Sequence, residues 1–476
     1  MKDIFTGEVS RIGIPVGEEP NAPVTFFGRA ISVAPDGKVA FASMASNLTA
    51  NDVNGQADVF VTTTTATSGG RTGKQVIDIN NGSEDFATDV VLLADGSLVL
   101  VGGSNNAHSV VRLNADGMLA GKVVFNVNLG NGYDFATSVA LQADGKLVLA
   151  GSSNGYDSNS GSYSNDFSVA RLNTDGSLDT SFGMGGTQIM GVNNGLVDYA
   201  TGVALQTDGK LVLASLNYGI DSNTGVYQSD FSVVRLNTDG SLDAGFGMGG
   251  KQIIDVNGSI DYAESVALQA DGKLVIAGAS NGDYGVVRLN TDGSLDASFG
   301  MGGKQIIDVN NGLSDYARSV VIQADGKLVL AGLTQNLNLN TGVYSNDFSV
   351  VRLNTDGSLD TSFGMDGKQI IDINNDSEDF AESIALQADG KLILAGRSQV
   401  NGQSHDVSVV RLNADGGLDT SFGMGGKQII DINNGSDDIV ESIVIQADGK
   451  LVLAGHSENG QSRDVSVVRL NVDGSL

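Results

Sequence analysis

The sequence repeats itself, and the length of the repeat limits the folds that the chain can adopt. A tetrapeptide of the form Ala/Thr-Asp-Gly-Lys/Ser, set between two apolar runs, recurs along the 476 residues. Successive copies are 49 to 64 residues apart, and their aspartates are Asp95, Asp144, Asp208, Asp271, Asp325, Asp389 and Asp448. A fixed period of this size is typical of propellers and solenoids. We therefore expect one repeat architecture rather than several unrelated domains.

Each copy contains four short apolar segments, as the copy around Asp271 shows at Ser265–Gln269, Lys273–Gly278, Tyr284–Leu289 and Lys304–Val309. All four have the length of strands and are rich in Val, Ile and Leu. The Asp-Gly between the first two segments supplies the positive φ angles of a tight hairpin. The second segment shows no apolar/polar alternation, which indicates that both faces of its sheet are covered. These features predict four-stranded antiparallel propeller blades; a β-helix solenoid is the alternative, but its coils are shorter.

Counting strands predicts an eight-bladed ring. A weaker copy precedes the seven strong ones, with Lys74–Ile79 as its fourth strand. The last copy stops at Leu476 before any fourth strand, while the apolar segment Glu8–Ile14 remains unassigned. We expect Glu8–Ile14 to pair with Ser466–Leu470 and close the ring, because an open ring would leave two exposed edges. The prediction is a single β-propeller domain over 1–476, with 1–73 as a divergent first blade plus closing strand and 74–476 as seven regular repeats.

Long phrases recur within the repeats. Arg352–Gly364 reads RLNTDGSLDTSFG, Gly367–Ile371 reads GKQII and Ala385–Gly396 reads ALQADGKLILAG. From about residue 74 to the end, the chain resembles the delta-60 repeat family of bacterial β-propeller repeats. The segment Asn51–Val61 is similar instead to other propeller-type repeats of bacterial extracellular proteins. The resemblance implies a fold and an association with large surface or secreted proteins, and it implies no settled activity.

Composition narrows the partners and the chemistry. With 27 Lys and Arg against 56 Asp and Glu, the net charge of -29 repels nucleic acid and anionic lipid. The absence of Cys and the presence of only three His exclude disulfides, catalytic thiols and histidine metal clusters, so oxygen-ligated ions, calcium foremost, remain. No apolar leader or membrane-spanning stretch is found. We expect no membrane insertion and an extracellular or cell-surface protein, with the cytoplasm as the alternative, that is a monomer or part of a larger polypeptide.

A repeated aspartate precedes each first strand and is the first candidate ligand-binding set. Its members are Asp85, Asp134, Asp198, Asp261, Asp315, Asp379 and Asp438. As a ring around one channel mouth they would bind cations or a cationic or polyhydroxylated ligand. The structural alternative is that each carboxylate accepts backbone hydrogen bonds in its own turn.

The opposite face carries the second candidate set, in loops of the form Asn-Thr-Asp-Gly-Ser-Leu-Asp. Oxygen donors at positions 1, 3 and 7 with Gly at position 4 partly resemble calcium loops, although the bidentate Glu of an EF-hand is missing. Turn formation is the alternative explanation. The candidate metal ligands are Asn173, Asp175, Asp179, Asp239, Asp243, Asp292, Asp296, Asp356, Asp360, Asp415 and Asp419.

The third candidate set lies in the connections between second and third strands, which vary most in length. The long ones carry tyrosines among Asn, Ser and Gly, a composition typical of surfaces that bind polar ligands. Solvated tips are the alternative. The candidate residues are Tyr156, Tyr163, Tyr218, Tyr227 and Tyr344.

Three function classes follow from these patterns. The first is a non-enzymatic binding or adhesion module that presents one face to a polar ligand or a protein or glycan partner, because no nucleophile, acid–base pair or histidine site is seen to break the repeat. The second is a carbohydrate-active enzyme or lectin that acts at the channel mouth, for which carboxylates converging in the channel would be the sign. The third is a purely structural repeat scaffold.

Overall fold

The computed structural model describes residues 73–476 apart from short loops, together with three strands nearer the N-terminus, 32–33, 39–43 and 58–62. The loop residues left out are 80–83, 128–132, 158–161, 193–196, 221–226, 259, 339–341, 375–376, 401, 403, 434 and 459–461. The chain forms two compact units, one of 1–71 with 116–119 and one of 72–115 with 120–476. Among the described residues, no helix has the length and apolarity to cross a membrane.

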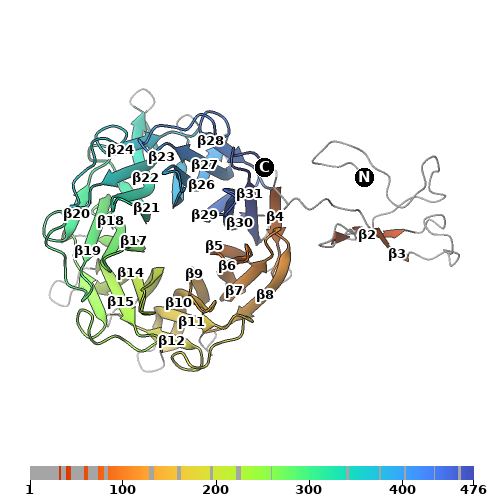
Figure 1. Ribbon diagram of the computed structural model, residues 1–476, viewed down its shortest axis with the longest axis horizontal. Coiled ribbons are helices and arrows are strands. Elements are labelled where there is room, and N and C mark those ends of the chain that lie inside the picture. The colour runs from red at the N-terminus through yellow and green to blue at the C-terminus, as the bar shows by residue number, and fades with distance from the viewer. Residues whose placement is uncertain are drawn as a thin grey trace. The chain divides into compact units, whose positions relative to one another are not determined.

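The larger unit is a ring of seven four-stranded blades around a central channel (Figure 1). Blade 1 consists of β5–β8, blade 2 of β9–β12, blade 3 of β13–β16, blade 4 of β17–β20, blade 5 of β21–β24 and blade 6 of β25–β28. Blade 7 consists of β29, β30, β31 and β4. A single parallel bridge between Asn165 and Val197 joins blades 2 and 3 into one continuous sheet.

The first strand of each blade lies innermost and the fourth lies at the rim (Figure 1). The first strands are β5 (Asp85–Leu92), β9 (Asp134–Leu141), β13 (Val197–Leu205), β17 (Asp261–Leu268), β21 (Asp315–Ile322), β25 (Asp379–Leu386) and β29 (Asp438–Ile445). The second strands are β6 (Leu98–Ser104), β10 (Leu147–Asp157), β14 (Leu211–Ile220), β18 (Leu274–Ser280), β22 (Leu328–Asn338), β26 (Leu392–Val400) and β30 (Leu451–Glu458). The third strands are β7 (Ala107–Leu113), β11 (Ser162–Leu172), β15 (Tyr227–Leu236), β19 (Asp283–Leu289), β23 (Val343–Leu353), β27 (Ser404–Leu412) and β31 (Arg463–Leu470). The fourth strands are β8 (Leu119–Phe125), β12 (Thr187–Met190), β16 (Lys251–Ile254), β20 (Lys304–Ile307), β24 (Lys368–Ile371), β28 (Lys427–Ile430) and, in blade 7, β4 (Gly73–Ile77).

The hairpin between first and second strands forms where the sequence predicts it. In blade 1 it turns at Asp95 and Gly96, and Gly96 has a φ of 82° that a residue with a Cβ adopts at a cost. The second strands β6 and β18 are buried along their whole length, as their lack of apolar/polar alternation indicates. The predicted four-stranded blades are therefore confirmed.

The hydrophobic core lies in layers between neighbouring blades. Between blades 3 and 4, for example, Val212, Phe231 and Phe246 of blade 3 pack with Ala263 and Leu274 of blade 4. Each blade thus covers both faces of its neighbours' sheets, and apolar burial holds the ring together.

The predicted number of eight blades is wrong, because the ring is complete with seven. β4 pairs antiparallel with β31, with Ile77 opposite Val465, and blade 7 packs against β5 of blade 1. The segment predicted as the fourth strand of a first blade therefore supplies the outer strand of the last one. The predicted closure by Glu8–Ile14 is wrong for the same reason: β4 holds the place beside β31, and Glu8–Ile14 lies outside the described residues.

The weak first repeat does contain strands, but they belong to another sheet. β1 (Ser32–Val33), β2 (Val39–Ser43) and β3 (Asp58–Thr62) form a three-stranded antiparallel sheet. The Asp-Gly between two apolar runs predicts a hairpin correctly, but a hairpin does not specify which ring, if any, it joins. Strand counting alone therefore gave one blade too many.

Candidate functional site

The seven repeated aspartates at the start of the first strands are buried, with exposed fractions of 0–2%. One oxygen of each accepts a hydrogen bond from the backbone N–H that follows the preceding outer strand, at 2.5–3.0 Å. The donors are Ile79, Val127, Val192, Val256, Val309, Ile373 and Ile432, and the acceptors are Asp85, Asp134, Asp198, Asp261, Asp315, Asp379 and Asp438. The structure thus gives these aspartates the turn-forming role in all seven blades.

Burial also raises the pKa of the repeated aspartates in blades 5–7. Removal from water raises the pKa of Asp315 and of Asp379 to about 6, although hydrogen bonds from Thr334 and from the backbone of Ile373 oppose the rise. Burial raises the pKa of Asp438 in the same way. These groups therefore hold their negative charge weakly unless positive charge is brought close.

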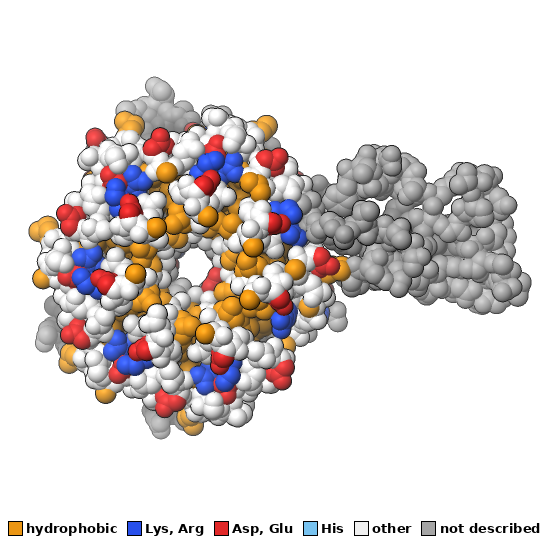
Figure 2. Space-filling model, viewed as in Figure 1, with side chains coloured by type: hydrophobic (Ala, Val, Ile, Leu, Met, Phe, Trp, Pro, Cys, Tyr) orange, Lys and Arg blue, Asp and Glu red, His pale blue; other side chains and the backbone are white. Residues whose placement is uncertain are grey.

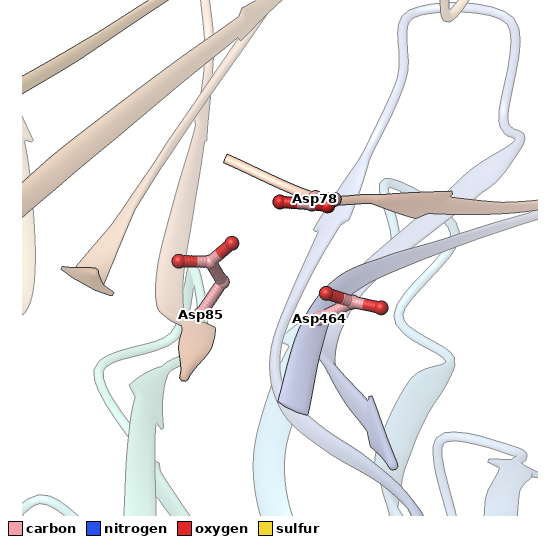
Figure 3. A group of neighbouring side chains, drawn as sticks. All are labelled: Asp78, Asp85 and Asp464. Carbon is pink, nitrogen blue, oxygen red and sulfur yellow. The ribbon is translucent and has the colours of Figure 1, made fainter. Parts of the chain in front are cut away.

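Two further aspartates join the buried one at five of the seven junctions between blades. Each trio combines an aspartate on the third strand, one just after the fourth strand and the buried one of the next blade, with one oxygen of each within 4.8 Å of the others. Figure 3 shows the trio at the junction of blades 7 and 1, where three separate segments bring Asp464, Asp78 and Asp85 together. The other trios are Asp230–Asp255–Asp261, Asp283–Asp308–Asp315, Asp347–Asp372–Asp379 and Asp406–Asp431–Asp438.

The two remaining junctions show what the fold itself requires. Between blades 1 and 2, Ala107 and Asn126 occupy the positions of the first two carboxylates, and between blades 2 and 3 Gly191 replaces the second. Asp134 and Asp198 still form their turns there. The fold therefore requires only the buried aspartate, and the other two carboxylates in each of the five trios need another explanation.

In the trio Asp406–Asp431–Asp438, one oxygen of Asp406 and one of Asp431 are buried without a donor in the described part of the chain. Asp406 is only 6% exposed, and no hydrogen-bond donor in the described part of the chain reaches its Oδ1. Burial, together with the charges of Asp431 and Asp438, raises the pKa of Asp406 to about 6. The ammonium of Lys74 donates to the main-chain oxygen of Asp431 beside the trio. A buried oxygen of this kind is costly unless a donor or a cation satisfies it.

The second candidate set, in the Asn-x-Asp-Gly loops, makes turns and ion pairs. Asp175 accepts bonds from the N–H and hydroxyl of Ser177 at 2.9 and 2.6 Å. Asp179 binds Arg171 at 2.7 Å and Lys146 at 2.8 Å, and the bond from Lys146 is the main reason that the pKa of Asp179 lies well below its usual range. Asp179 therefore already has two cationic partners, and Asp175 is bonded within its own turn, so neither carboxylate depends on a metal ion for a partner.

The same arrangement recurs in four more blades. Asp239, Asp292 and Asp356 bind the serine two residues later, as Asp175 does, and Asp415 binds the N–H of Gly417. The paired aspartates Asp243, Asp296, Asp360 and Asp419 bind an arginine at 2.7–2.8 Å. Asn173 bonds within its own loop. Figure 2 shows basic and acidic side chains repeating together around one face of the ring.

The tyrosine-bearing connections are extensions of the second and third strands. Tyr156 pairs with Tyr163, Tyr218 with Ser229 and Ile220 with Tyr227, so these segments form long hairpins. Tyr344 pairs with Leu337, and its side chain is 52% exposed. A surface role for Tyr344 therefore stays a prediction.

A charged cluster on the innermost strands breaks the repeat and was missed by the sequence reasoning. Arg318 binds Glu264 at 2.9 Å and lies 3.7 Å from Glu382, which in turn binds Arg397 at 3.0 Å. Burial and the charge of Glu382 raise the pKa of Glu441 to about 7. The third residue after the repeated aspartate could have revealed this cluster, because it is threonine in blades 1–3 and charged in blades 4–7.

Comparisons with known proteins support the fold. A family profile described as "Domain of unknown function (DUF5122) beta-propeller" matches residues 93–119, 142–182, 206–246, 269–299, 323–363, 387–422 and 446–476, more than half of the chain. No curated protein matches the sequence.

Solved structures with a similar arrangement share little sequence. Virginiamycin B lyase from Staphylococcus aureus is 11% identical, with 83% of this chain and 98% of that one covered and a TM-score of 0.45. An ulvan lyase is 12% identical, with 85% and 95% covered and a TM-score of 0.46. NanB sialidase from Streptococcus pneumoniae is 11% identical, with 84% and 70% covered and a TM-score of 0.40. Similarities this distant carry no information about activity.

Proposed function

This chain belongs to the beta-propeller family described as domain of unknown function DUF5122, and from that premise we propose that it is a non-enzymatic binding module. One face would hold divalent cations, calcium foremost, in the aspartate trios between blades, and would present them to a polar ligand or protein partner. We also propose that the module belongs to a secreted or surface bacterial protein, in line with its resemblance to delta-60 repeats.

The observation that carries the proposal is the trio Asp406–Asp431–Asp438, with its buried and donorless oxygen. Two oxygens that share a calcium ion at about 2.4 Å are at most about 4.8 Å apart, and the three aspartates meet this limit. Carboxylates are the ligands that calcium prefers, and water or main-chain oxygens would complete its shell. A cation there would satisfy Asp406 and offset the repulsion among the three charges.

The repetition of the trio along the ring indicates how the ions would act in binding. Five trios lie at successive junctions from blades 3 and 4 round to blades 7 and 1, so the ions would form an arc rather than a full ring. An ion with open coordination positions on such an arc would attract carboxylate or hydroxyl groups of a partner. Each ion would also join two blades.

Calcium titration by isothermal calorimetry tests the proposal. We expect several binding events per chain, and fewer in a variant with both Asp406→Asn and Asp431→Asn. The matched control is Asp175→Asn with Asp239→Asn, which removes the same charge from the opposite face and should leave binding unchanged. Absence of calcium binding at millimolar concentrations would refute the proposal and favour a purely structural scaffold.

The charged cluster on the innermost strands, which we call the channel cluster, favours a second function, a carbohydrate-active enzyme. Glu441 has a pKa raised to about 7 beside Glu382, which is ion-paired to Arg397 and lies 3.7 Å from Arg318. Hydrolysis of glycosidic bonds usually needs a carboxyl group that is protonated near neutral pH and a second carboxyl group beside it. Cleavage of acidic and neutral polysaccharides by the wild type, lost in Glu441→Gln, would support the enzyme. Unchanged polysaccharides in every case would leave the binding module as the better proposal.

A further inference from the structure

The junction between blades 1 and 2 lacks a segment that blades 2–6 contain at the same place. In blade 2, residues 177–187 read SLDTSFGMGGT, whereas the matching residues 118–122 of blade 1 read MLAGK. Blade 1 has therefore lost six residues, including the aspartate and the phenylalanine. Ala120 stands where blade 2 has Asp179.

In blades 2–6 this segment closes the gap to the next blade. Phe182 is fully buried, and the guanidinium of Arg171 lies 4.7 Å from its ring centre while binding Asp179 at 2.7 Å. The ring also fills the space above Gly240 of blade 3, where an added Cβ would lie 3.0 Å from the ring. The same contacts join Phe246, Phe299 and Phe363 to Gly293, Gly357 and Gly416.

Where the segment is missing, the structure has a pocket of about 610 Å³. Val99 and Val110 of blade 1 and Leu147 and Leu172 of blade 2 line it, and it reaches Gly176. A Cβ on Gly176 would meet only Val123, at 3.6 Å. The volume is in the range of about 300–1,000 Å³ that is usual for ligand sites.

The arginine that contacts the aspartate and the phenylalanine in blades 2–6 is also present in blade 1, as Arg112. Arg112 lines the pocket and donates to the main-chain oxygen of Thr174 in blade 2 at 3.2 Å, as Arg171 does to Thr238 in blade 3. Among the described residues, no carboxylate lies within salt-bridge distance of Arg112. The pocket thus combines apolar walls with a guanidinium that forms no direct ion pair with a described residue, although the carboxylates of Asp95 and Asp175 also line the pocket.

We infer that this pocket binds, in trans, a peptide segment that carries an aspartate and a phenylalanine spaced as in Leu-Asp-Thr-Ser-Phe. The carboxylate would pair with Arg112, and the aromatic ring would stack on the same guanidinium and cover Gly176. Five blades show that this surface type accepts such a segment, with a ring 4.6–4.7 Å from the arginine each time. The lining holds two cationic side chains, Arg112 and Lys122, and two carboxylates, Asp95 and Asp175, so direct pairing with Arg112 rather than the net charge of the pocket would select the peptide aspartate.

The occupant is a segment of another protein rather than a second copy of this chain. The described copies of the motif in blades 2–6 are already folded into their own junctions, with their phenylalanines fully buried. A second copy of the chain therefore has no free motif among blades 2–6 to place in the pocket. A partner that displays the motif in an extended, exposed segment fits the shape of the pocket and supplies a carboxylate for Arg112.

Binding of a capped synthetic peptide SLDTSFG, the sequence of residues 358–364, tests the inference. The full chain would be titrated in 0.15 M salt and followed by calorimetry and by fluorine NMR of a 4-fluorophenylalanine form. We expect saturable 1:1 binding that weakens at least tenfold in Arg112→Gln, and at least tenfold when the peptide aspartate becomes asparagine. Val123→Phe should also abolish binding, because the new side chain fills the seat above Gly176.

Arg463→Gln is the matched control, since it removes the same charge from an exposed position on blade 7 and should leave binding unchanged. Failure of the peptide to bind at millimolar concentrations overturns the inference. Binding that survives both Arg112→Gln and Val123→Phe overturns it too, because the peptide would then sit elsewhere. If 3-phenylpropionate binds and the peptide does not, the pocket is a small-molecule site and the peptide proposal is wrong.

Discussion

Replacing Asp431 by asparagine should change the stability of the protein in opposite directions with and without calcium. In the trio Asp406–Asp431–Asp438, one oxygen of each carboxylate lies within 4.8 Å of the others. Without a cation, the exchange removes one of the repelling charges and stabilises the fold. With calcium present, the same exchange removes a ligand and therefore part of the stabilisation that the ion supplies.

The expected changes in the free energy of unfolding follow from the distance between the carboxylates. Two unit charges 4.8 Å apart repel by about 3.5 kcal/mol at an effective dielectric constant of about 20, and the partial exposure of Asp431 reduces this to roughly 1–3 kcal/mol. An ion at 100 times its dissociation constant stabilises the fold by about 2.7 kcal/mol per site. With an unfolding entropy of about 2.1 cal/mol/K per residue over roughly 400 residues, 1 kcal/mol shifts the Tm by about 1 °C.

In chelator, the stability difference between the wild type and Asp431→Asn should depend on pH. Burial and the charges of Asp431, Asp438 and Asp437 raise the pKa of Asp406 to about 6, against the opposing charge of Lys74. A carboxyl whose pKa is raised in the folded state stabilises the fold below its unfolded pKa of about 3.8, and this contribution is lost as the pH rises through 6. Asp431→Asn should lose less stability over that interval than the wild type.

The assay is the Tm of both proteins at pH 4.5, 6 and 7.5, in calcium, in magnesium and in sodium chloride with chelator, at matched ionic strength. We expect Asp431→Asn to melt about 1–3 °C higher than the wild type in chelator at pH 7.5. In calcium it should gain about 3 °C less than the wild type. Identical shifts in all three salts, or a variant that is less stable than the wild type in chelator, would show that the trio is not a cation site.

Deletion of 1–72 should leave the ring monomeric, whereas deletion through Ile79 removes β4, exposes β31 and should cause aggregation in size-exclusion chromatography; equal behaviour of the two would contradict the closure. Phe299→Ala should cost about 3–5 kcal/mol in denaturant unfolding because the ring is fully buried, and a loss below 1 kcal/mol would show that the junction adapts. Glu441→Gln should remove a titration near pH 7 from carboxyl NMR spectra, and a transition that persists would belong to another group.

The blade is predictable from the sequence because its signals are local. The Asp-Gly pair at Asp95 and Gly96 specifies a hairpin over a few residues, and the apolar run of β6 specifies a strand covered on both faces. The number of blades depends instead on which distant strands meet. The repeat read from Lys74 fits the outer strand of a first blade as well as that of the last, and only the packing of blade 7 against blade 1 decides between them.

The candidate site could also be predicted only in part, because some of its residues recur locally and others meet only through contacts between distant strands. The aspartates from Asp85 to Asp438 stood out because they recur, and recurrence marks architecture first. Their partners, such as Asp406 and Asp431, are 25 residues apart and meet only when strands fold back. The channel cluster and the pocket at Arg112 lie where the sequence departs from the repeat. Glu441 replaces the threonine of blades 1–3 in the cluster, and Ala120 replaces the aspartate of blades 2–6 at the pocket, so neither site is marked by a recurring phrase.

Closure by β4 has a consequence for the order of folding. Within a blade each strand contacts one that lies a few residues away, but Ile77 and Val465 pair across almost the whole of the ring's sequence. Closing a loop that long costs roughly 5 kcal/mol of chain entropy, against roughly 2 for a ten-residue hairpin. During synthesis the early blades would therefore stack as an open arc, with β4 waiting unpaired until the last repeat emerges from the ribosome. The trio Asp78–Asp85–Asp464 is assembled only at that final step, so a cation held there would report that the ring has closed.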